Sequence, residues 1–570
     1  MEMVTLTIDG KQIKAPKTAT VLEACRTAGA SVPTLCYHPE LRPEGACRVC
    51  MVEVEGARTL VASCVYPVNE GMVVKTNTAQ VREARKTVVE LLLANHPPDC
   101  LGCQRNLKCE LQKIASDMGI RKIRFDGERK QYPLDKSNPS LVRDQEKCIL
   151  CGRCIRACSE RQGVHVYSFV NRGFSTTVNP AFNLGLDEVA CTYCGQCAAV
   201  CPTAAIVEKD ETDQVWQAIS DPKKHVIVQT APSVRVALGE ELGMDHGKIV
   251  TGQMVAALRR IGFDRVFDTD FSADLTIMEE GHEFIHRLLN GGQLPMVTSC
   301  SPGWINFIEN FYPDLLGHLS TAKSPMQMFG ALVKTFYAEK TGIDPKDIVS
   351  VAIMPCTAKK AEAAREEMGD DVDIVLTTRE LGRMIMQAGI DFTNLESEEF
   401  DTPLGISTGA AVIFGASGGV MEAALRTVAD VVTGEKLEDF EYHGVRGLTG
   451  IKEAEVTLAG KTVKVAVANT LSNARIMMDK IRKGEADYHF IEIMACPGGC
   501  IGGGGQPTPI SAEIRQRRID SIYESDVQHE YRKSHDNPAI KELYDTWLGK
   551  PNGEKAHHLL HTHYHPQHKI

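Results

Sequence analysis

The sequence lacks a signal peptide, a long apolar run and an excess of positive charge. Met1 leads directly into strand-like alternation, so we expect a cytoplasmic protein. The longest apolar stretches fall short of the roughly 20 residues that a membrane helix needs, so we expect no membrane association. A formal net charge of −11 argues against nucleic acid and anionic lipid as partners, because both bind basic patches. A small redox protein suits this charge better.

Cysteine becomes rare after residue 210, where only four of the 20 cysteines lie. The others fall in short clusters within a large chain, which is typical of metal sites in a reducing compartment rather than of disulfides. The two parts of the chain therefore differ in chemistry. The first is expected to carry electrons, and the second to use them.

Two runs of cysteines with matched spacing lie between residues 148 and 201. In such runs three thiolates bind one iron–sulfur cube and the fourth reaches the other cube. Zinc knuckles are the alternative reading, since Cys-x-x-Cys pairs also bind zinc, but two matched runs of four favour the cubes. We predict one [4Fe–4S] cluster on Cys148, Cys151, Cys154 and Cys201, and a second on Cys191, Cys194, Cys197 and Cys158.

The first segment alternates like a strand over residues 4–8 and 11–14, and a helix is expected over 21–28. The glycine and alanine before Cys47 leave backbone N–H groups free to approach cluster sulfurs. Scattered buried thiols are the alternative, because the first cysteine gap departs from the plant-type ferredoxin pattern; Cys25 is read as such a core thiol. We predict a [2Fe–2S] cluster on Cys36, Cys47, Cys50 and Cys64.

A helix predicted over residues 79–95 precedes one histidine and three cysteines. A lone histidine at a helix end is usually a capping or solvent residue, but here it completes a set of four donors. Imidazole in place of thiolate removes one negative charge and changes the reduction potential. We predict a third [4Fe–4S] cluster on His96, Cys100, Cys103 and Cys109.

The fold class predicted is multidomain α/β and α+β. Buried strands at residues 226–229, 295–298, 349–354, 463–468 and 488–493, separated by helical lengths, indicate a large α/β catalytic domain. The predicted domains are a ferredoxin-like β-grasp (1–78), a small helical His/Cys3 module (79–138), a two-cluster ferredoxin domain (139–209), the catalytic domain (210–525) and a polar, helical tail (526–570). The six histidines between residues 557 and 568 of that tail could bind metal, but a solvated tail is the favoured interpretation.

The four late cysteines follow probable strands in distinctive company. They lie in Thr-Ser-Cys300-Ser301-Pro-Gly-Trp, in Met354-Pro-Cys356-Thr-Ala-Lys359, and in Met494-Ala-Cys496-Pro-Gly-Gly-Cys500 before a glycine run. With these motifs the chain resembles the iron-only (FeFe) hydrogenases, specifically the single-chain clostridial type with four accessory clusters. The resemblance covers nearly the whole chain, and these three motifs are highly specific to that family.

The resemblance implies an H-cluster, a [4Fe–4S] cube joined through a cysteine sulfur to a diiron unit with CO, cyanide and a bridging dithiolate. Cys356 and Cys496 match cube ligands, and Cys500 matches the shared thiolate. Lys359 is similar to the lysine that pairs with cyanide. The residues that match the lining of the diiron pocket are Pro232, Ser233, Met354 and Met494.

The chain departs from the family before Pro-Gly-Trp, where two consecutive cysteines are usual and Cys300-Ser301 stands. By position Cys300 is the proton relay and Ser301 the cube ligand. Serine has a high pKa and replaces thiolate poorly. Three outcomes stay open: Ser301 ligates weakly, Cys300 turns in as the ligand, or an exogenous ligand fills the gap. Met326 also stands where the family commonly has glutamine.

Two glutamates three residues apart share one face of a predicted helix, with Arg287 one turn further on. A solvated acidic face is the alternative. The family resemblance instead implies a relay from Cys300 to solvent through Glu280, Ser320, Glu283 and Arg287. Carboxylates in an apolar channel have raised pKa values and can carry protons near neutral pH.

The sequence thus predicts a ferredoxin hydrogenase that reversibly reduces protons to H2, with maturation proteins supplying the diiron unit. The electron-input subunit of a respiratory NADH dehydrogenase resembles the first 210 residues equally well, but the later cysteine motifs argue against it. A weakly active or non-catalytic relative, either a cluster-assembly factor or a hydrogen sensor, is the other alternative, which Ser301 keeps open.

Overall fold

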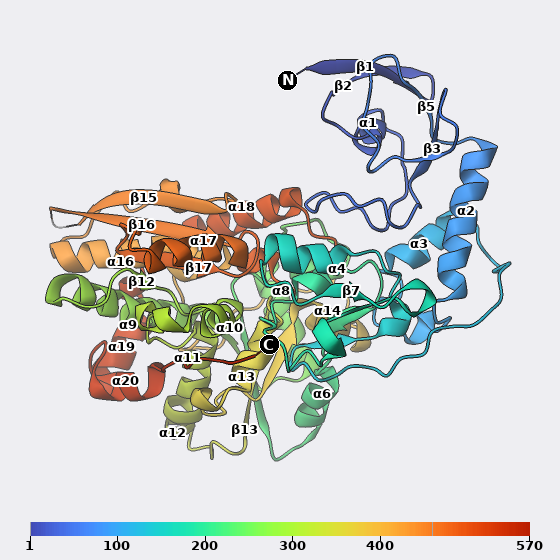
Figure 1. The fold of residues 1–570 in the computed structure, drawn as a ribbon. Coiled ribbons are helices and arrows are strands. Elements are labelled where there is room, and N and C mark those ends of the chain that lie inside the picture. The colour runs from blue at the N-terminus through green and yellow to red at the C-terminus, as the bar shows by residue number, and fades with distance from the viewer. Residues whose placement is uncertain (1, 459, 570) are drawn as a thin grey trace.

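The computed structural model describes residues 2–458 and 460–569. The N-terminal domain is a mixed sheet of order β2-β1-β5-β3-β4 that stands apart from the body of the molecule (Figure 1). Its strands pair across a turn at Asp9-Gly10, both with positive φ, and Thr20 and Glu23 form a capping box at its helix. The elements are β1 (Met3–Ile8), β2 (Lys11–Pro16), α1 (Val21–Thr27), β3 (Met51–Val54), β4 (Val61–Ala62) and β5 (Val73–Lys75).

Two helices connect this domain to the body along one side of the molecule (Figure 1). They are α2 (Ala79–Ala94), which Thr78 caps, and α3 (Glu110–Asp117). Residues 121–138 run as an extended segment, so the predicted small module is helical only in its first part.

The next segment repeats one local design twice. A glycine in the left-handed region, Gly152 (φ 69°) or Gly195 (φ 68°), sits in each cysteine run and starts a short helix. Only glycine adopts this φ readily while its backbone turns N–H groups toward the cysteine sulfurs. The elements are α4 (Arg153–Arg156), α5 (Gln196–Ala199) and two ribbons, β6 (Leu141–Arg143) with β9 (Ile206–Glu208) and β7 (Ser168–Val170) with β8 (Thr177–Asn179).

The large domain contains two four-stranded sheets, as the alternating apolar pattern predicts. The first, β11-β10-β13-β14, is parallel throughout. The second, β12-β17-β16-β15, is parallel except for the antiparallel edge strand β15. The strands are β10 (His225–Thr230), β11 (Arg265–Asp268), β12 (Met296–Val297), β13 (Ile348–Met354), β14 (Ile374–Thr377), β15 (Ile451–Leu458), β16 (Lys461–Asn469) and β17 (Phe490–Met494).

All five predicted strands overlap observed ones, whereas β11, β14 and β15 were not predicted. Helices cover both sheets (Figure 1), and valine, leucine and methionine side chains between sheet and helix form separate buried clusters around each sheet. The helices are α6 (Thr212–Ser220), α7 (Leu238–Glu241), α8 (Thr251–Ile261), α9 (Thr269–Asn290), α10 (Pro302–Phe311), α11 (Pro325–Leu332), α12 (Ala338–Thr341), α13 (Ala358–Ala363), α14 (Thr378–Gln387), α15 (Gly409–Val412), α16 (Gly419–Thr433) and α17 (Leu471–Arg482).

The last segment is packed against the large domain, so the prediction of a solvated tail was wrong. Ala556 and Leu560 lie one turn apart on α20 and are both 0% exposed, within an apolar cluster that contains Phe329 and Leu332. The histidines had made the stretch look polar, but they alternate with this apolar face. The elements here are α18 (Ala512–Gln528), α19 (Pro538–Leu543) and α20 (Glu554–Leu560).

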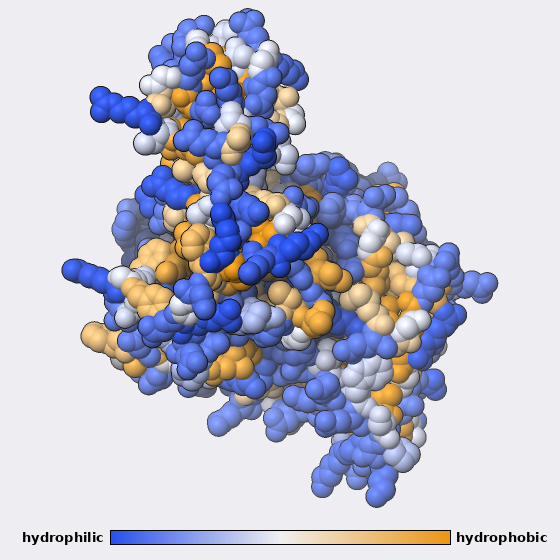
Figure 2. Space-filling model, turned by 90° about the vertical axis from the view of Figure 1, so that its right-hand side faces the viewer, coloured by the Kyte–Doolittle hydropathy of each residue, from blue (hydrophilic) through white to orange (hydrophobic). Residues whose placement is uncertain are grey.

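The face that carries α2 and α3 is mostly hydrophilic, with apolar side chains in separate small patches (Figure 2). Within residues 2–458 and 460–569, the helices all lack the length and apolar character needed to cross a bilayer.

Candidate active site

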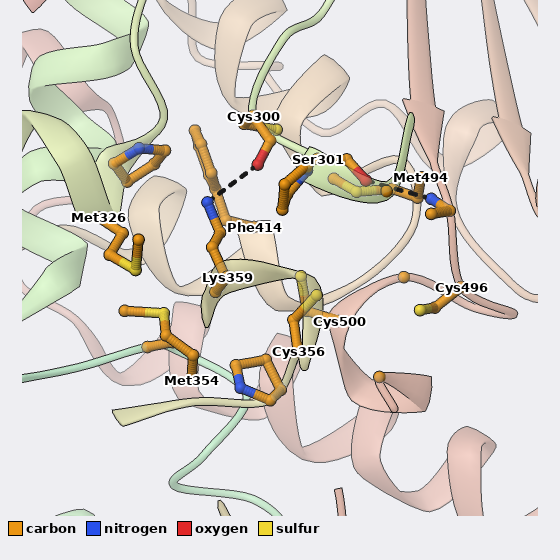
Figure 3. A pocket seen from close by; sticks show the side chains of 18 of the residues that line it. Cys300, Ser301, Met326, Met354, Cys356, Lys359, Phe414, Met494, Cys496 and Cys500 are labelled. Carbon is orange, nitrogen blue, oxygen red and sulfur yellow. Dashed lines mark hydrogen bonds between the residues drawn. The ribbon is translucent and has the colours of Figure 1, made fainter. Parts of the chain in front are cut away.

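The candidate active site lies where strands of both sheets end. The loops after β10, β12, β13 and β17 surround a cavity of about 780 Å³. Ligand sites commonly form at the carboxyl ends of parallel strands, where side chains from separate loops converge. The structure brings together in this cavity five residues predicted as ligands or relay, which are Cys300, Ser301, Cys356, Cys496 and Cys500 (Figure 3).

The rest of the wall is largely apolar and thioether. Met354 and Met494, both predicted to line the pocket, lie across the cavity from one another with Met326 and Phe414 (Figure 3). Such surfaces accept a weakly polar group such as CO without competing hydrogen bonds. Pro232 is also part of this wall, whereas Ser233 lies behind it and its hydroxyl accepts a hydrogen bond of 3.3 Å from Gln506.

Lys359 supplies the one ammonium group among the residues lining this cavity. Its Nζ donates to the Cys300 carbonyl (3.2 Å) and pairs with Glu362 (2.7 Å), as Figure 3 shows for the first contact. Sequence reasoning missed Glu362, although its spacing of three residues from Lys359 on α13 was a usable signal. The lysine is thus fixed with its charge toward the cavity.

Burial shifts the thiols of this cavity away from ionisation. It raises the pKa of Cys356 to about 12 and that of Cys500 to about 11, and it raises the pKa of Cys496 well above the ordinary range. Buried thiols of this kind favour a metal, because coordinated iron replaces the proton and neutralises the thiolate charge. The donor set therefore fits an iron–sulfur group.

Ser301 is both the N-cap of α10 and part of the cavity wall. Pro302 at the first helical position fixes the entry of the chain into the helix. The Ser301 hydroxyl accepts a hydrogen bond of 3.3 Å from the N–H of Ala495, next to Cys496. Its oxygen is therefore on the same side of the cavity as a predicted cube ligand.

The predicted relay residues lie along α9 and the segment after β12. Glu280 is 1% exposed, and its two carboxylate oxygens find no hydrogen-bond partner among the described residues. Burial, followed by the Glu283 carboxylate, raises the Glu280 pKa to about 8, while Ser320 acts in the opposite direction. Glu283 accepts hydrogen bonds from Ser320 (2.9 Å) and Arg287 (2.6 Å).

Cys300 lies between these relay residues and the large cavity. Burial raises its pKa well above the ordinary thiol range, the Glu280 carboxylate adds to that rise, and Lys359 lowers it. Hydrogen bonds thus link Arg287, Glu283 and Ser320, and Glu280 is near enough to Cys300 to raise the pKa of its thiol. At the inner end a neutral carboxyl near pH 7 is adjacent to a neutral thiol.

Three smaller cavities each gather one complete predicted ligand set. A cavity of about 450 Å³ is lined by Cys148, Cys151, Cys154 and Cys201, and one of about 330 Å³ by Cys158, Cys191, Cys194 and Cys197. A third, of about 270 Å³, is lined by His96, Cys100, Cys103 and Cys109.

His96 fits a ligand role better than a capping role. Its Nδ1 is buried with no hydrogen-bond partner in residues 2–458 and 460–569, yet it belongs to the wall of the third cavity. A buried polar atom without a partner costs free energy, which a bound metal would offset.

The four N-terminal thiols are also together. The Cys36 N–H donates to the Cys47 sulfur (3.4 Å), the neighbouring Cys47 and Cys64 thiols lower the pKa of Cys36, and that of Cys64 lowers the pKa of Cys50. Cys25 lies in the nearby apolar core, as predicted, and burial raises its pKa to about 11. In the described part of the chain no three metal-type side chains converge on the position of one ion. A cluster distributes its ligands over several irons and does not require such convergence.

Direct hydrogen bonds to backbone carbonyls link the sites. Arg156 on α4 donates to the Cys36 carbonyl (2.7 Å), and the Glu110 N–H at the start of α3 donates to the Pro202 carbonyl (3.0 Å). Both contacts lead to the cavity of Cys148 and Cys201. Cys194 lines both the cavity of its own set and the large cavity.

Comparisons with known proteins find family matches along the chain. Five descriptions match it: "2Fe-2S iron-sulfur cluster binding domain" at residues 1–79, "NADH-ubiquinone oxidoreductase-G iron-sulfur binding region" at 85–124, "4Fe-4S dicluster domain" at 147–205, "Iron only hydrogenase large subunit, C-terminal domain" at 224–504 and "Iron hydrogenase small subunit" at 512–567.

Similar proteins include full-length relatives. The chain is 51% identical to "NADP-reducing hydrogenase subunit HndD" of Solidesulfovibrio fructosivorans, covering 99% of each chain, and 43% identical to "Iron hydrogenase 1" of Clostridium pasteurianum, covering 99% of this chain and 100% of the relative. Among solved structures, an apo [FeFe]-hydrogenase variant from Chlamydomonas reinhardtii is 45% identical, with a TM-score of 0.57 over 63% of this chain and all of that one.

Proposed function

The chain belongs to the iron-only hydrogenase family, and from this premise we propose that it interconverts protons, electrons and dihydrogen at the large cavity. The observation that carries the proposal is the gathering of Cys300, Ser301, Cys356, Cys496 and Cys500 in one cavity with thioether walls and a single lysine. The alternative functions require fewer of these features. An electron-input subunit needs only the N-terminal sites, and an assembly factor has no use for a proton route.

We propose that Cys356, Cys496 and Cys500 hold a cube, with Ser301 at its fourth corner, and that Cys500 also binds the diiron unit. When bound, this group supplies the redox chemistry of hydrogen. The protein supplies thiolates and a cation, because Lys359 can donate to an anionic cyanide ligand. Met326, Met354 and Met494 exclude water and leave CO ligands without competitors.

Ser301 is the weak point of that ligand set. The hydroxyl already accepts from Ala495, and alkoxide is a harder, less available ligand than thiolate. Since Ser301 rather than Cys300 is adjacent to Cys496 through this bond, we propose that Ser301 is the ligand and that Cys300 keeps the relay role. The cube is then held by three thiolates and one oxygen.

Protons are proposed to move between solvent and the cavity along Arg287, Glu283, Ser320, Glu280 and Cys300. A carboxyl with a pKa of about 8 both accepts and releases protons near neutral pH, which suits Glu280 for this step. Glu283 lies between Ser320 and Arg287 on this route, at 2.9 Å and 2.6 Å. Cys300 then delivers the proton at the cavity.

Electrons are proposed to enter through two outer sites and to converge on the cluster of Cys148, Cys151, Cys154 and Cys201. One input is the Cys36 site, tied to α4 by Arg156, and the other is the His96 site, tied through Pro202. From there they pass to the cluster of Cys191 and Cys194 and then to the large cavity, whose wall includes Cys194. In all we propose one [2Fe–2S] and three accessory [4Fe–4S] clusters.

The external donor has two candidates. Reduced ferredoxin suits the His96 site, where Cys100 is exposed and Leu101 and Leu107 are 93% and 89% exposed, an apolar contact area for a small protein. The relative that is 51% identical over its full length carries the name of an NADP-reducing hydrogenase subunit, which favours partner subunits linked to a nicotinamide cofactor.

The test uses full-length protein matured anaerobically with a source of the diiron unit. Infrared bands in the CO and cyanide stretching region, together with H2 evolution from reduced ferredoxin, are expected. Bands without activity from ferredoxin, but with activity from NADPH once partner subunits are added, would assign the second donor. Absence of the bands, with accessory clusters visible by paramagnetic resonance, would favour a non-catalytic relative.

A further inference from the structure

The C-terminal segment completes the outer end of the proton route. Residues 560–562 pair with 321–323: the Lys323 N–H donates to the Leu560 carbonyl (2.8 Å) and the Thr562 N–H to the Thr321 carbonyl (2.8 Å). This pairing fixes His561 beside α9. His561 is 7% exposed and thus differs from the exposed histidines His557 and His558 on the helix before it.

His561 connects two acidic residues of α9. Its Nε2 lies 2.9 Å from Glu279 Oε2, and its Nδ1 lies 2.8 Å from the Thr321 hydroxyl. Thr321 in turn faces Glu283 Oε2, with its hydroxyl at 3.3 Å and its N–H at 3.0 Å. Glu279 and Glu283 are one turn apart, so one face of α9 carries both ends of this chain.

The surroundings determine which imidazole nitrogen carries the hydrogen. Glu279 also accepts from the Tyr544 hydroxyl and from the Asn552 N–H (2.8 Å), so its carboxylate is fixed as an acceptor. An acceptor at Nε2 holds the hydrogen on that nitrogen and leaves Nδ1 with a free lone pair. Neutral His561 therefore accepts the Thr321 O–H, whereas the imidazolium donates to Thr321 and turns that O–H toward Glu283.

We propose that His561 is a proton store for the relay and exchanges one proton with Glu283 through the Thr321 hydroxyl. In the forward step the O–H bond of protonated Glu283 breaks and Thr321 Oγ1 takes that proton. Thr321 gives its own hydrogen to Nδ1, which leaves an imidazolium and a carboxylate. No electrons are transferred, and the reverse step restores the start.

The charges around His561 support this exchange. Glu279 and Glu283 are the acidic neighbours, and Arg287 balances Glu283 at 2.6 Å. The ring of His557 stacks on that of His561 with centroids 4.6 Å apart and planes 6° apart, so one exposed imidazole covers the buried one. His563 follows on the same segment, and Tyr544 caps Glu279. His561 is thus buried, and the exposed ring of His557 lies between it and solvent.

This inference rests on the proposed function, and the variant that tests it is His561→Gln. Glutamine can still donate to Glu279, but it cannot take up a proton. His558→Gln, exposed on the helix just before His561, is the matched control, and Thr321→Val removes the connecting hydroxyl. The H2 evolution rate is measured from pH 6 to pH 9 with wild type and each variant.

An imidazole takes up a proton more readily as the pH falls, so the store should matter most at the acid end of the measured range. We expect His561→Gln to evolve H2 about 5-fold more slowly than wild type at pH 6 and equally fast at pH 9, below the roughly 100-fold loss of a direct carrier. Thr321→Val should reproduce this profile and His558→Gln should match wild type. In His561→Gly, added imidazole should restore the rate at pH 6. Unchanged profiles for His561→Gln and Thr321→Val would overturn the proposal.

A second readout does not depend on turnover. Nitrogen NMR of full-length protein with labelled histidine should show a signal that His561→Gln removes, with hydrogen on Nε2 alone at high pH and on both nitrogens at low pH. A signal with hydrogen on Nδ1 alone would overturn the store even if the protein evolved H2. Inactive wild type with the expected signal would instead contradict only the proposed hydrogenase function.

Discussion

Lys359 and Glu362 form a buried ion pair of 2.7 Å at the wall of the large cavity. Both side chains are at most 11% exposed, so neither charge is well screened by water. Removing one member of such a pair leaves the other charge uncompensated.

Glu362→Gln is therefore expected to lower the free energy of unfolding of the protein without its diiron unit by about 3–5 kcal/mol. The loss should be smaller in matured protein, because an anionic ligand beside Lys359 replaces the missing charge. Denaturant unfolding of both forms measures this difference. Asp117→Asn, in the exposed pair with Lys113, is the control and should cost about 0.5 kcal/mol or less. Equal losses in both forms would argue against an anion at Lys359.

Ser301→Cys is expected to strengthen the cube. Sulfur is a softer ligand for iron than a hydroxyl, and the side chain already faces the cavity next to Ala495. The iron content after exposure to a chelator should rise relative to wild type, and Ser301→Ala should lower it. If all three proteins retained the same iron, position 301 would not be a ligand.

Glu280→Gln should have opposite effects on activity and stability. Loss of a proton carrier lowers the rate by about 100-fold or more. The folded-state pKa of about 8 lies above the ordinary 4.5, so the stability that protonated Glu280 contributes is lost as pH rises between these values. The unfolding free energy of the variant, relative to that of wild type, should therefore increase as the pH rises to about 8, by a few kcal/mol at most. The exposed Glu438→Gln should show neither effect, and a constant stability difference between pH 4 and pH 9 would contradict the buried, neutral carboxyl.

His96→Cys should lower the reduction potential of its cluster. Thiolate adds one negative charge where imidazole adds none, and replacement of cysteine by histidine raises potentials by on the order of 100 mV or more in related clusters. A redox titration followed by paramagnetic resonance measures the shift. The exposed His443→Cys controls for the added thiol, and an unshifted potential would exclude His96 as a ligand.

Gly504→Ala should impair the contact between the last accessory site and the large cavity. A Cβ at this position would lie 2.4 Å from the Cys194 carbonyl oxygen, so the backbones must separate. Overpacking of this kind costs about 1–3 kcal/mol. Electron delivery, measured by flash reduction, should slow while the iron content is unchanged. Gly127→Ala, which meets no described atom within 4 Å, should leave both unchanged.

Local spacing was enough to predict which cysteines lie together. The thiols of Cys191, Cys194 and Cys197 are close in sequence, and a left-handed Gly195 brings them around one cavity. Strands with a continuous apolar run, such as β13, were predictable for a similar reason, because such a run has few alternatives, whereas the longer β15 has a mixed pattern and was missed. β11 and β14 have four residues each, too few for a periodic signal.

Contacts between distant segments could not be predicted. Thr321 and His561 are 240 positions apart, and neither has a neighbour that indicates the other. The tail was misread because its histidines are conspicuous, whereas its burial depends on Ala556 and Leu560, two residues with an ordinary helical spacing. Burial of this kind is decided by the surface against which the helix packs, which a local pattern does not contain.

In the electron route proposed above, the contacts of Arg156 with Cys36 and of Glu110 with Pro202 would join two separate inputs to one shared path. With all clusters in place, loss of either outer cluster would leave the other able to pass electrons inward. The stretch from Cys148 to Cys194 would have no alternative route in this arrangement. Two donors of different potential would also meet before that stretch. The electrons that reach the large cavity would then come from both donors. One donor could also be reduced by the other through this protein.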